Sequence, residues 1–296
     1  MSHSISRRDF TKLAGFGGVA FASGLFANEA ARAASGTDFH FVQLSDSHWG
    51  FSGDPLNPEA KTTLPRAVAA VNALAAPPDF VIFTGDLTHT TEDVAERKKR
   101  MTEFRQIVKD LKVKDVYFIP GEHDASLDKG AAYKEFFGET HFAFKHKGIN
   151  FVALDNVSDP KAFIGDEQLK WLDGELAKIK KNEPIVVFAH RPLFDLYPQW
   201  DWATADGTEV TNRLAKFDHV VVFYGHIHQE NHQTIGNITH HAATSLIFPL
   251  IAPGSGPKRM PIAWDKDAPF KGLGWRNVDA DPKSAEYQLV QNPVKA

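Results

Sequence analysis

Val220-Val221-Val222-Phe223-Tyr224 is a run of five apolar residues that ends abruptly in Gly225-His226-Ile227-His228. A short apolar run followed by glycine predicts a buried β-strand. Side chains two residues apart along an extended chain point the same way, so His226 and His228 are expected to reach one site together. A histidine pair at this spacing is equally compatible with a local structural role, and the other strands decide between the two.

Four further apolar runs end in similar chemistry. Residues 39–44 are followed by Asp46 and His48, residues 79–84 by Asp86, residues 116–119 by Glu122 and His123, and residues 185–189 by His190. Helical patterns at 63–76, 92–111, 166–181 and 208–216 lie between strands, which predicts sheets with helices packed on their faces. Because the carboxyl ends of the strands in such a sheet share one edge, binding groups collect there.

The carboxylates Asp46, Asp86 and Glu122 would repel one another at a shared edge unless cations were bound there. Carboxylates and neutral imidazoles suit zinc, iron or manganese. Seven candidate ligands are too many for one ion and fit two ions that share a bridge: Asp46, His48, Asp86, Glu122, His190, His226 and His228. Asp86 is the expected bridge, because a carboxylate has two oxygens.

Each of these residues also has a plainer interpretation when it is taken alone. Asp86 after Gly85 is typical of a turn or a helix cap, and a single buried His190 is typical of a hydrogen-bonded core residue. A metal-free binding module is a third possibility, which conflicts with three converging carboxylates. Five strand ends with this chemistry favour a metal site.

The composition is that of a globular protein that can bury a full core. The chain has 296 residues, of which 43% are hydrophobic and 24% charged, and a formal net charge of -4. No basic patch indicates binding to nucleic acid. The absence of cysteine excludes disulfides, thiolate ligands and cysteine nucleophiles. Any metal must therefore be held by nitrogen and oxygen.

The N-terminus resembles a twin-arginine export signal. Arg7-Arg8 precedes a mildly apolar stretch from Leu13 to Ala27, and Ala31-Arg32-Ala33 supplies a small-x-small cleavage site. The apolar stretch is shorter than the ~20 residues that a spanning helix needs. We therefore expect residues 1–33 to be a signal peptide that engages the twin-arginine machinery, and the mature protein to be periplasmic, exported folded and without a membrane span. The alternative is a disordered or membrane-anchoring N-terminus.

Residues 34–296 are expected to form a single domain. From about residue 253 the sequence is rich in proline and glycine with isolated tryptophans. This composition predicts an irregular tail with one strand at 287–290.

The motif order resembles that of the calcineurin-like metallophosphoesterases. It consists of Asp46-x-His48, Gly85-Asp86, Gly121-x-His123-Asp124, His190 and Gly225-His226-x-His228. The resemblance covers about residues 39–243 and implies an α/β fold, a four-layer αββα sandwich of two mixed β-sheets flanked by helices. The wording Gly85-Asp86-Leu87-Thr88 is closest to the branch with the class III cyclic nucleotide phosphodiesterases.

The resemblance also implies a role for each motif residue. Asp46, His48 and His228 would hold the first metal and His190 and His226 the second, with Asp86 bridging. His123 would contact the substrate phosphate and protonate the leaving oxygen, while His89 is expected to be structural. Glu122 departs from the family, which usually has asparagine there. This added negative charge would weaken the metals as Lewis acids and favour a higher oxidation state such as ferric iron.

The expected activity is hydrolysis of a small-molecule phosphomonoester or phosphodiester by metal-activated hydroxide. The alternative is a periplasmic metal-handling or redox protein on the same scaffold, for which Glu122 is the support. Tyr197, Trp200 and Trp202 either form an aromatic lip for the substrate or pack structurally. Arg191 is a candidate phosphate clamp. His240 and His241 are expected to be structural or to support the ligands.

Overall fold

The computed structural model describes residues 39–281 and 286–295, so the expected signal peptide at 1–33 lies outside the described residues. In chain order the elements are β1 (Phe39–Leu44), α3 (Ala60–Asn72), β2 (Phe80–Thr84), α4 (Val94–Val108), β3 (Asp115–Ile119), α5 (Glu122–Ala125), α6 (Ala131–Phe137), β4 (Phe142–His146), β5 (Ile149–Ala153), α7 (Gly165–Leu176), β6 (Ile185–Phe188), a 3-10 turn (Pro198–Trp200), α8 (Gly207–Leu214), β7 (Val220–Tyr224), β8 (Asn231–Ile235), β9 (Ile238–Ala242), β10 (Gly274–Asp281) and β11 (Glu286–Pro293).

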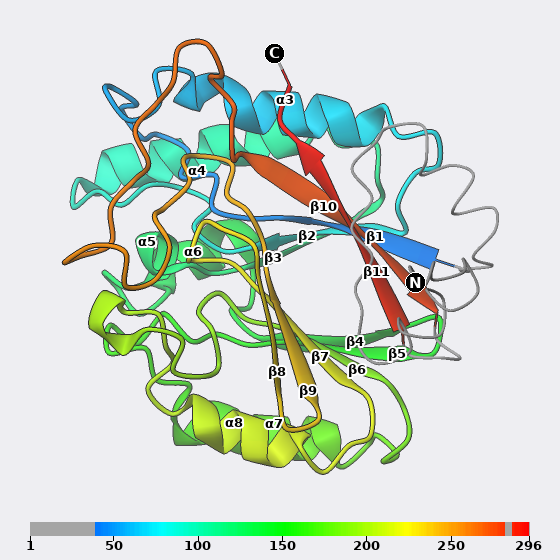
Figure 1. Cartoon of the computed structure of the whole chain (residues 1–296). Helices are drawn as coiled ribbons and strands as arrows, with labels where there is room; N and C mark the ends of the chain where they lie inside the picture. Colours follow the sequence, from blue (N-terminus) through cyan, green and yellow to red (C-terminus); the bar gives the residue numbers. More distant parts are fainter. Residues whose placement is uncertain (1–38, 282–285, 296) are drawn as a thin grey trace, which may run out of the picture.

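Two mixed sheets pack face to face, and helices cover their outer faces (Figure 1). The first sheet has the strand order β11-β10-β1-β2-β3, and the second has β4-β5-β6-β7-β9-β8. Helices α3 and α4 cover the first sheet, while α7 and α8 cover the second. The predicted four-layer αββα sandwich is confirmed.

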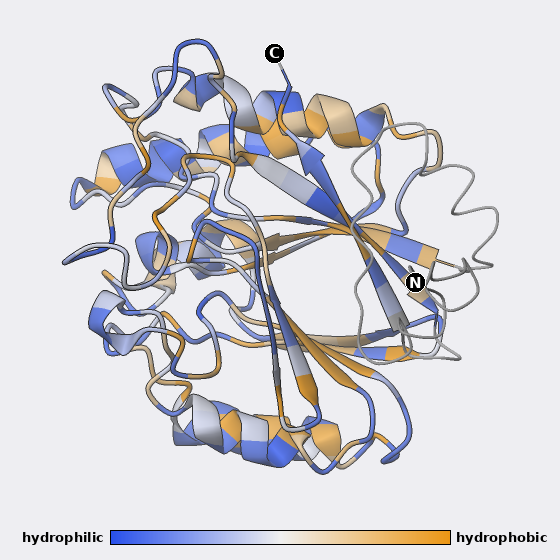
Figure 2. Ribbon diagram, viewed as in Figure 1, coloured by the Kyte–Doolittle hydropathy of each residue, from blue (hydrophilic) through white to orange (hydrophobic). Residues whose placement is uncertain are grey.

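The central strands β1, β2, β5, β6 and β7 are buried on both faces, and β6 and β7 are apolar along their whole length. Along β1, Phe41 points between the sheets and Val42 points toward α3 and α4. Along β7, Phe223 points between the sheets and Val222 points toward α7 and α8. Successive side chains of a strand point to opposite faces. A continuous apolar run is therefore the pattern of a strand with helices on one side and a second sheet on the other (Figure 2).

Aromatic rings fill the space between the two sheets. The ring of Phe41 stacks on Phe80 with centroids 4.9 Å apart, and it meets Phe151, Phe188 and Phe223 of the second sheet edge-on. Offset stacking and edge-to-face contacts are the arrangements that aromatic rings prefer. This layer holds the two sheets in a fixed relation.

The parallel strands of each sheet place their carboxyl ends at one edge. In the first sheet β1, β2 and β3 are parallel and aligned, with Leu44 opposite Phe83 and Thr84 opposite Ile119. In the second sheet β5, β6, β7 and β9 are parallel. Hydrogen bonds cross between the sheets at this edge, including Gln43 Nε2 to the carbonyl oxygen of Tyr224 at 3.3 Å. The turns that follow β1, β2, β3, β6 and β7 form a common rim, on which the site is built.

The prediction of an irregular tail from about residue 253 is wrong for the last part of the chain. Residues after 253 are irregular until Leu273, but β10 then pairs antiparallel with β1, and β11 pairs with β10. The expected strand at 287–290 lies within β11. The pattern of β10 is hidden because Arg276, Asn277 and Asp279 are buried polar residues. Their polarity removes the apolar signal of a strand.

Helix boundaries also differ from the expected ranges. Helix α3 starts at Ala60, three residues before the expected start, and stops at Asn72. Asn57 accounts for the early start, because its side-chain oxygen accepts the backbone N–H of Glu59 and its carbonyl accepts that of Ala60. Within the described part of the chain, no helix has both the length and the apolar character to cross a membrane.

Candidate metal centre

Left-handed backbone turns present the candidate ligands at the rim. Asp46, His48, Asp86, His226 and His228 all have positive φ, between 42° and 65°. This conformation costs a residue other than glycine about 1–2 kcal/mol. Such strain persists only where the surrounding structure enforces it, and it is common at functional sites. The conformation turns each strand end back so that its side chain faces the neighbouring strand ends.

The first group of side chains consists of Asp46, His48 and His228, whose ligand atoms lie within 4.8 Å of one another. His48 Nε2 and His228 Nε2 are 3.3 Å apart, and Asp46 Oδ1 is 3.4 Å from His228 Nε2. All three residues are buried. The backbone N–H of His226 donates to the carboxylate of Asp46 at 3.1 Å, so a strand end of the second sheet fixes a ligand carried by the first.

The second group consists of Asp86, Glu122, His190 and His226, again within 4.8 Å. Glu122 reaches both histidines, with Oε1 3.0 Å from His226 Nδ1 and Oε2 3.0 Å from His190 Nε2. The carboxylate thus occupies the position expected of a ligand. Arg191 Nε lies 3.6 Å from Glu122 Oε2 and partly balances the extra negative charge.

A single oxygen of Asp86 lies between the two groups. Asp86 Oδ2 is 3.4 Å from His48 Nε2 and 3.4 Å from His190 Nε2. Its Oδ1 accepts the backbone N–H of His123 at 2.9 Å. From the sequence, Asp86 was expected to bridge the two ions because its carboxylate has two oxygens. In the structure one oxygen is used by the backbone, and the other alone faces both groups.

Hydrogen bonds fix which nitrogen of each histidine faces the site. Thr84 O lies 2.7 Å from His190 Nδ1, Asp201 O 3.0 Å from His226 Nε2 and Phe248 O 2.8 Å from His228 Nδ1. A carbonyl oxygen accepts only from a protonated nitrogen, so the opposite nitrogen of each ring is left with its lone pair. Those lone pairs are the ones that lie within the two groups.

The electrostatics of the site favour a cation. Burial alone would lower the pKa of His190, but the carboxylates of Asp86 and Glu122 raise it well above the usual value. Burial alone would raise the pKa of Glu122, but His226 and His190 hold it well below the usual value. His190 Nε2 and Glu122 Oε2 are buried and neither makes a well-aligned hydrogen bond to the described residues. A metal ion would satisfy both atoms, and the donor set fits zinc, iron or manganese. These two groups form a two-metal site.

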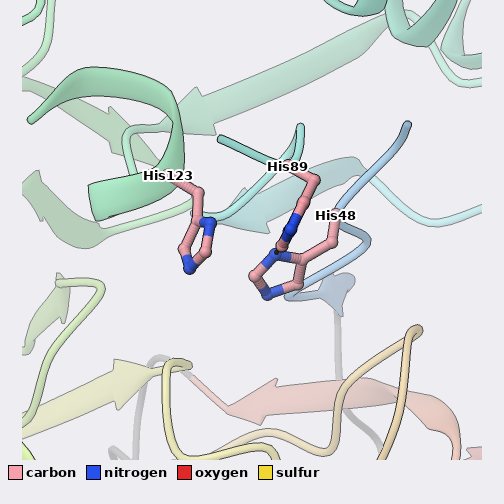
Figure 3. A group of neighbouring side chains, drawn as sticks. All are labelled: His48, His89 and His123. Atoms are coloured by element: carbon pink, nitrogen blue, oxygen red, sulfur yellow. Dashed lines mark hydrogen bonds between the residues drawn. The ribbon is translucent and has the colours of Figure 1, made fainter. Parts of the chain in front are cut away.

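His48 of the first group also lies close to two further histidines, His89 and His123 (Figure 3). His48 Nδ1 is 3.2 Å from His89 Nδ1, while the ring of His89 stacks on that of His123 with centroids 4.9 Å apart. Burial and the neighbouring His123 lower the pKa of His89 to about 4, so its ring is neutral at pH 7. We interpret His89 as the hydrogen-bond partner that orients His48.

Asp124 organises the loops beneath the site, a role that sequence reasoning missed. Its carboxylate accepts the backbone N–H groups of Leu87, Thr88 and Gly121 at 2.8–3.1 Å and the hydroxyl of Thr88 at 2.9 Å. Burial and the charge of Asp86 raise the pKa of Asp124 to about 7. The sequence signal for this role was the position of Asp124 directly after His123 in the motif. It ties the turn after β2 to the turn after β3.

A cavity of about 180 Å³ opens over both groups. It is lined by His48, Asp86, His89, Glu122, His123, His226, His228, Phe248, Leu250, Arg259 and Pro261. A larger hollow of about 710 Å³ lies between α4, β3 and α6, and none of the seven candidate ligands lines it. The chemistry therefore belongs to the smaller cavity.

Trp200 and Trp202, for which an aromatic lip and structural packing were the two alternatives, are buried structural residues. Trp200 is 4% exposed and Trp202 is fully buried, and both pack with Tyr224, Ile227 and Leu250. His240 contacts the ring of Phe194, and His241 lies 2.7 Å from His232 through their Nδ1 atoms. Neither histidine belongs to the two groups of candidate ligands. The structural alternative holds for these four residues.

Comparison with known proteins finds one family for most of the chain. A family model described as calcineurin-like phosphoesterase matches residues 39–230. The match spans the strand ends from β1 to β7, and so it includes all seven candidate ligands.

Named relatives include both phosphatases and phosphodiesterases. The serine/threonine-protein phosphatase CPPED1 of Mus musculus is 27% identical over 228 residues, covering 68% of this chain and 72% of the relative. A probable cyclic nucleotide phosphodiesterase of Rhodopseudomonas palustris is 26% identical, covering 73% and 83%. A dimetal phosphatase from Danio rerio has the same fold, with a TM-score of 0.59 at 14% identity, covering 86% of this chain and 95% of the other.

We expect Gly121→Ala to lower the metal content of the purified protein. A Cβ at Gly121 would overlap the backbone nitrogen and Oδ1 of Asp86, so Asp86 would have to move out of its position between the groups. Elemental analysis by mass spectrometry measures the result. Gly174→Ala is the control, because its Cβ would meet nothing within 4 Å in the last turn of α7. Two ions per chain in both variants would contradict the packing argument.

Proposed function

This chain belongs to the calcineurin-like phosphoesterase family, and we propose that it hydrolyses a small-molecule phosphomonoester or phosphodiester at the two-metal site on the rim. The observation that carries the proposal is the position of Asp86 Oδ2, 3.4 Å from one histidine of each group, with His123 lining the same cavity. This arrangement could hold two cations next to a residue that can donate a proton.

We assign Asp46, His48 and His228 to one ion and Glu122, His190 and His226 to the other, with Asp86 shared. When bound, two such ions neutralise charge on the phosphate and make water a better nucleophile. The protein keeps the ligands in place beforehand, through the left-handed turns and the carbonyl acceptors behind the imidazoles. Little rearrangement is then needed when substrate enters.

His123 is proposed to act on the leaving oxygen. The backbone N–H of Thr90 lies 3.3 Å from His123 Nδ1 and donates to it, which leaves the ring proton on Nε2. In this state Nε2 donates a hydrogen bond to an oxygen of the substrate. Transfer of a proton to the leaving oxygen needs the doubly protonated ring. In that state Nδ1 also carries a proton and cannot accept a hydrogen bond, so the weak contact with the Thr90 N–H must break. His123 then transfers the proton from Nε2 to the departing alkoxide.

The alternative function is non-hydrolytic metal handling or redox chemistry, and Glu122 favours it. With Asp46 and Asp86, this residue gives three ligand carboxylates within the two groups. The added charge stabilises a trivalent ion relative to a divalent one. Two bound ions without turnover of any phosphate ester would support this alternative.

Export through the twin-arginine pathway is proposed from the N-terminal residues. Its support is Arg7-Arg8, the apolar stretch that follows and the small residues around Arg32. The twin-arginine route carries folded proteins, so the metal site would be assembled before the chain crosses the membrane.

We expect His123→Ala to retain both ions and to lose about 10²–10⁴-fold in turnover, the usual contribution of general acid catalysis. The loss should be smaller for 4-nitrophenyl phosphate than for phenyl phosphate, because the better leaving group needs less protonation. Steady-state kinetics and metal analysis measure both effects. His219→Ala, an exposed histidine remote from the rim, is the control. Equal losses on the two substrates would remove the proton-donor role.

We expect Glu122→Asn to bind its second ion less tightly and to turn over faster with divalent metals. Removal of one negative ligand raises the Lewis acidity of the ions. Glu122→Gln separates charge from side-chain length, and it should move both quantities in the same direction. The measurements are metal content after dialysis and kcat with added Mn²⁺ or Zn²⁺. Variants that match the wild type in both would show that Glu122 is not a ligand.

For export, we expect replacement of Arg7 and Arg8 together by lysine to leave the protein in the cytoplasm of a Gram-negative host. The twin-arginine machinery reads the arginine pair, and lysine conserves only the charge. Cell fractionation followed by N-terminal sequencing gives the result for both forms. Wild-type protein that stays in the cytoplasm with residues 1–33 attached would refute the proposal.

A further inference from the structure

A segment outside the family match covers one side of the cavity. Residues 248–262, here called the strap, form a loop whose two ends pair through an antiparallel bridge between Leu250 and Pro261. Ile251 donates to the carbonyl of Met260 at 3.0 Å, and Ile262 donates to that of Pro249 at 2.9 Å. The match to the family ends at residue 230. The strap therefore adds a wall that the matched motifs do not supply.

The strap is fixed to a candidate ligand. The carbonyl of Phe248 accepts from His228 Nδ1 at 2.8 Å. Gln229, the residue after His228, donates from Nε2 to the carbonyls of Leu250 and Ile251 at 3.4 and 3.1 Å. One end of the strap is thus positioned by the same turn that positions the metal site.

The strap brings three apolar side chains and one cation to the cavity. Phe248, Leu250 and Pro261 line it, and the ring of Phe248 lies 5.0 Å from that of His228. Among the described residues that line this cavity, Arg259 alone is a lysine or arginine. The cavity therefore has an apolar side and one permanently charged group, in addition to the ligands.

Among the described residues, the guanidinium of Arg259 makes only long polar contacts. Its Nη1 lies 3.5 Å from the carbonyl oxygen of Trp200, and its Nη2 lies 4.0 Å from Asp201 Oδ2. A charge-assisted hydrogen bond has a length of about 2.7–2.9 Å. The side chain of Asp201 is 66% exposed, so water screens its charge. Arg259 keeps the capacity to bind a further anion.

Arg259 lies on the side of His226 that faces away from Glu122 and the second group of ligands. Asp201, its neighbour, contacts His226 at Nε2 through its carbonyl. The nitrogen of His226 that faces Glu122 is Nδ1, on the other side of the ring. Arg191, in contrast, lies 3.6 Å from Glu122 itself. Arg191 thus belongs to the metal end of the cavity, and Arg259 belongs to its outer end.

We propose that Arg259 binds a second anionic group on the substrate, a carboxylate or a second phosphate, at the end opposite the ester that is cleaved. The connecting part of the substrate packs against Phe248, Leu250 and Pro261. The planar guanidinium suits both anions, because each offers two oxygens for paired hydrogen bonds. This inference rests on the proposed function for the position of the reacting phosphate.

Non-hydrolysable phosphonates test the proposal by binding alone. The ligands are phenylphosphonate derivatives that carry a carboxylate, a second phosphonate or a neutral carboxamide at the para position. Titration calorimetry with the metal-loaded protein gives their dissociation constants. We expect at least one of the two anionic ligands to bind about five- to tenfold more tightly than the carboxamide, and the larger gain identifies the anion.

Variants of the strap separate the arginine from general electrostatics. For each variant the ratio compares the dissociation constant of the carboxamide with that of the tighter-binding anionic ligand. Arg259→Met should reduce this ratio to about one, and Arg259→Lys should keep part of it. Lys258→Met removes a charge from the exposed neighbour and should leave the wild-type ratio. Equal binding of anion and carboxamide by the wild type, or a ratio that survives Arg259→Met, would overturn the proposal. Failure to hydrolyse any ester would instead count against the proposed function, because the binding ratio does not depend on turnover.

Discussion

The mutual repulsion of three converging carboxylates, two of them buried and one partly buried, is the constraint on which this structure depends. Asp46, Asp86 and Glu122 lie at one rim within two groups of ligand atoms, and four imidazoles complete those groups. Without cations, the carboxylates of Asp86 and Glu122 favour the protonated ring of His190, and they raise its pKa against the effect of burial. Two metal ions would offset the repulsion. The positive-φ turns that carry Asp46, Asp86 and the paired histidines persist because the surrounding structure enforces them.

The geometry of the site comes from both sheets at once. The carboxylate of Asp46, on the first sheet, accepts the N–H of His226 on the second, and Thr84 accepts from His190 across the same boundary. These hydrogen bonds require the sheets to keep a fixed distance, which the aromatic layer around Phe41 provides. Packing far from the rim therefore sets distances within the metal centre.

The C-terminal part of the chain serves both the fold and the site. It returns to the first sheet as β10, which pairs with β1, the strand that leads to Asp46 and His48. Before that it forms the strap, which lies against His228 and lines the cavity with Phe248 and Arg259. The family match covers the metal-binding motifs, while this segment supplies the outer wall. In the proposed scheme, recognition of the substrate by the strap is separate from the chemistry at the rim.

The sequence by itself determined the strands, the helices between them and the chemistry of their ends, because these depend on local periodicity and residue type. Apolar runs such as Val220 to Tyr224 predict buried strands, and the motif order pointed to the sandwich. Tertiary structure alone decided that β10 is an interior strand, because its polar residues Arg276 and Asp279 are placed there by pairing with β1 and β11. It also decided that one oxygen of Asp86 faces both groups, that Trp202 is core and that Arg259 reaches the cavity. Each of these depends on contacts between residues far apart in the chain, which no local pattern encodes.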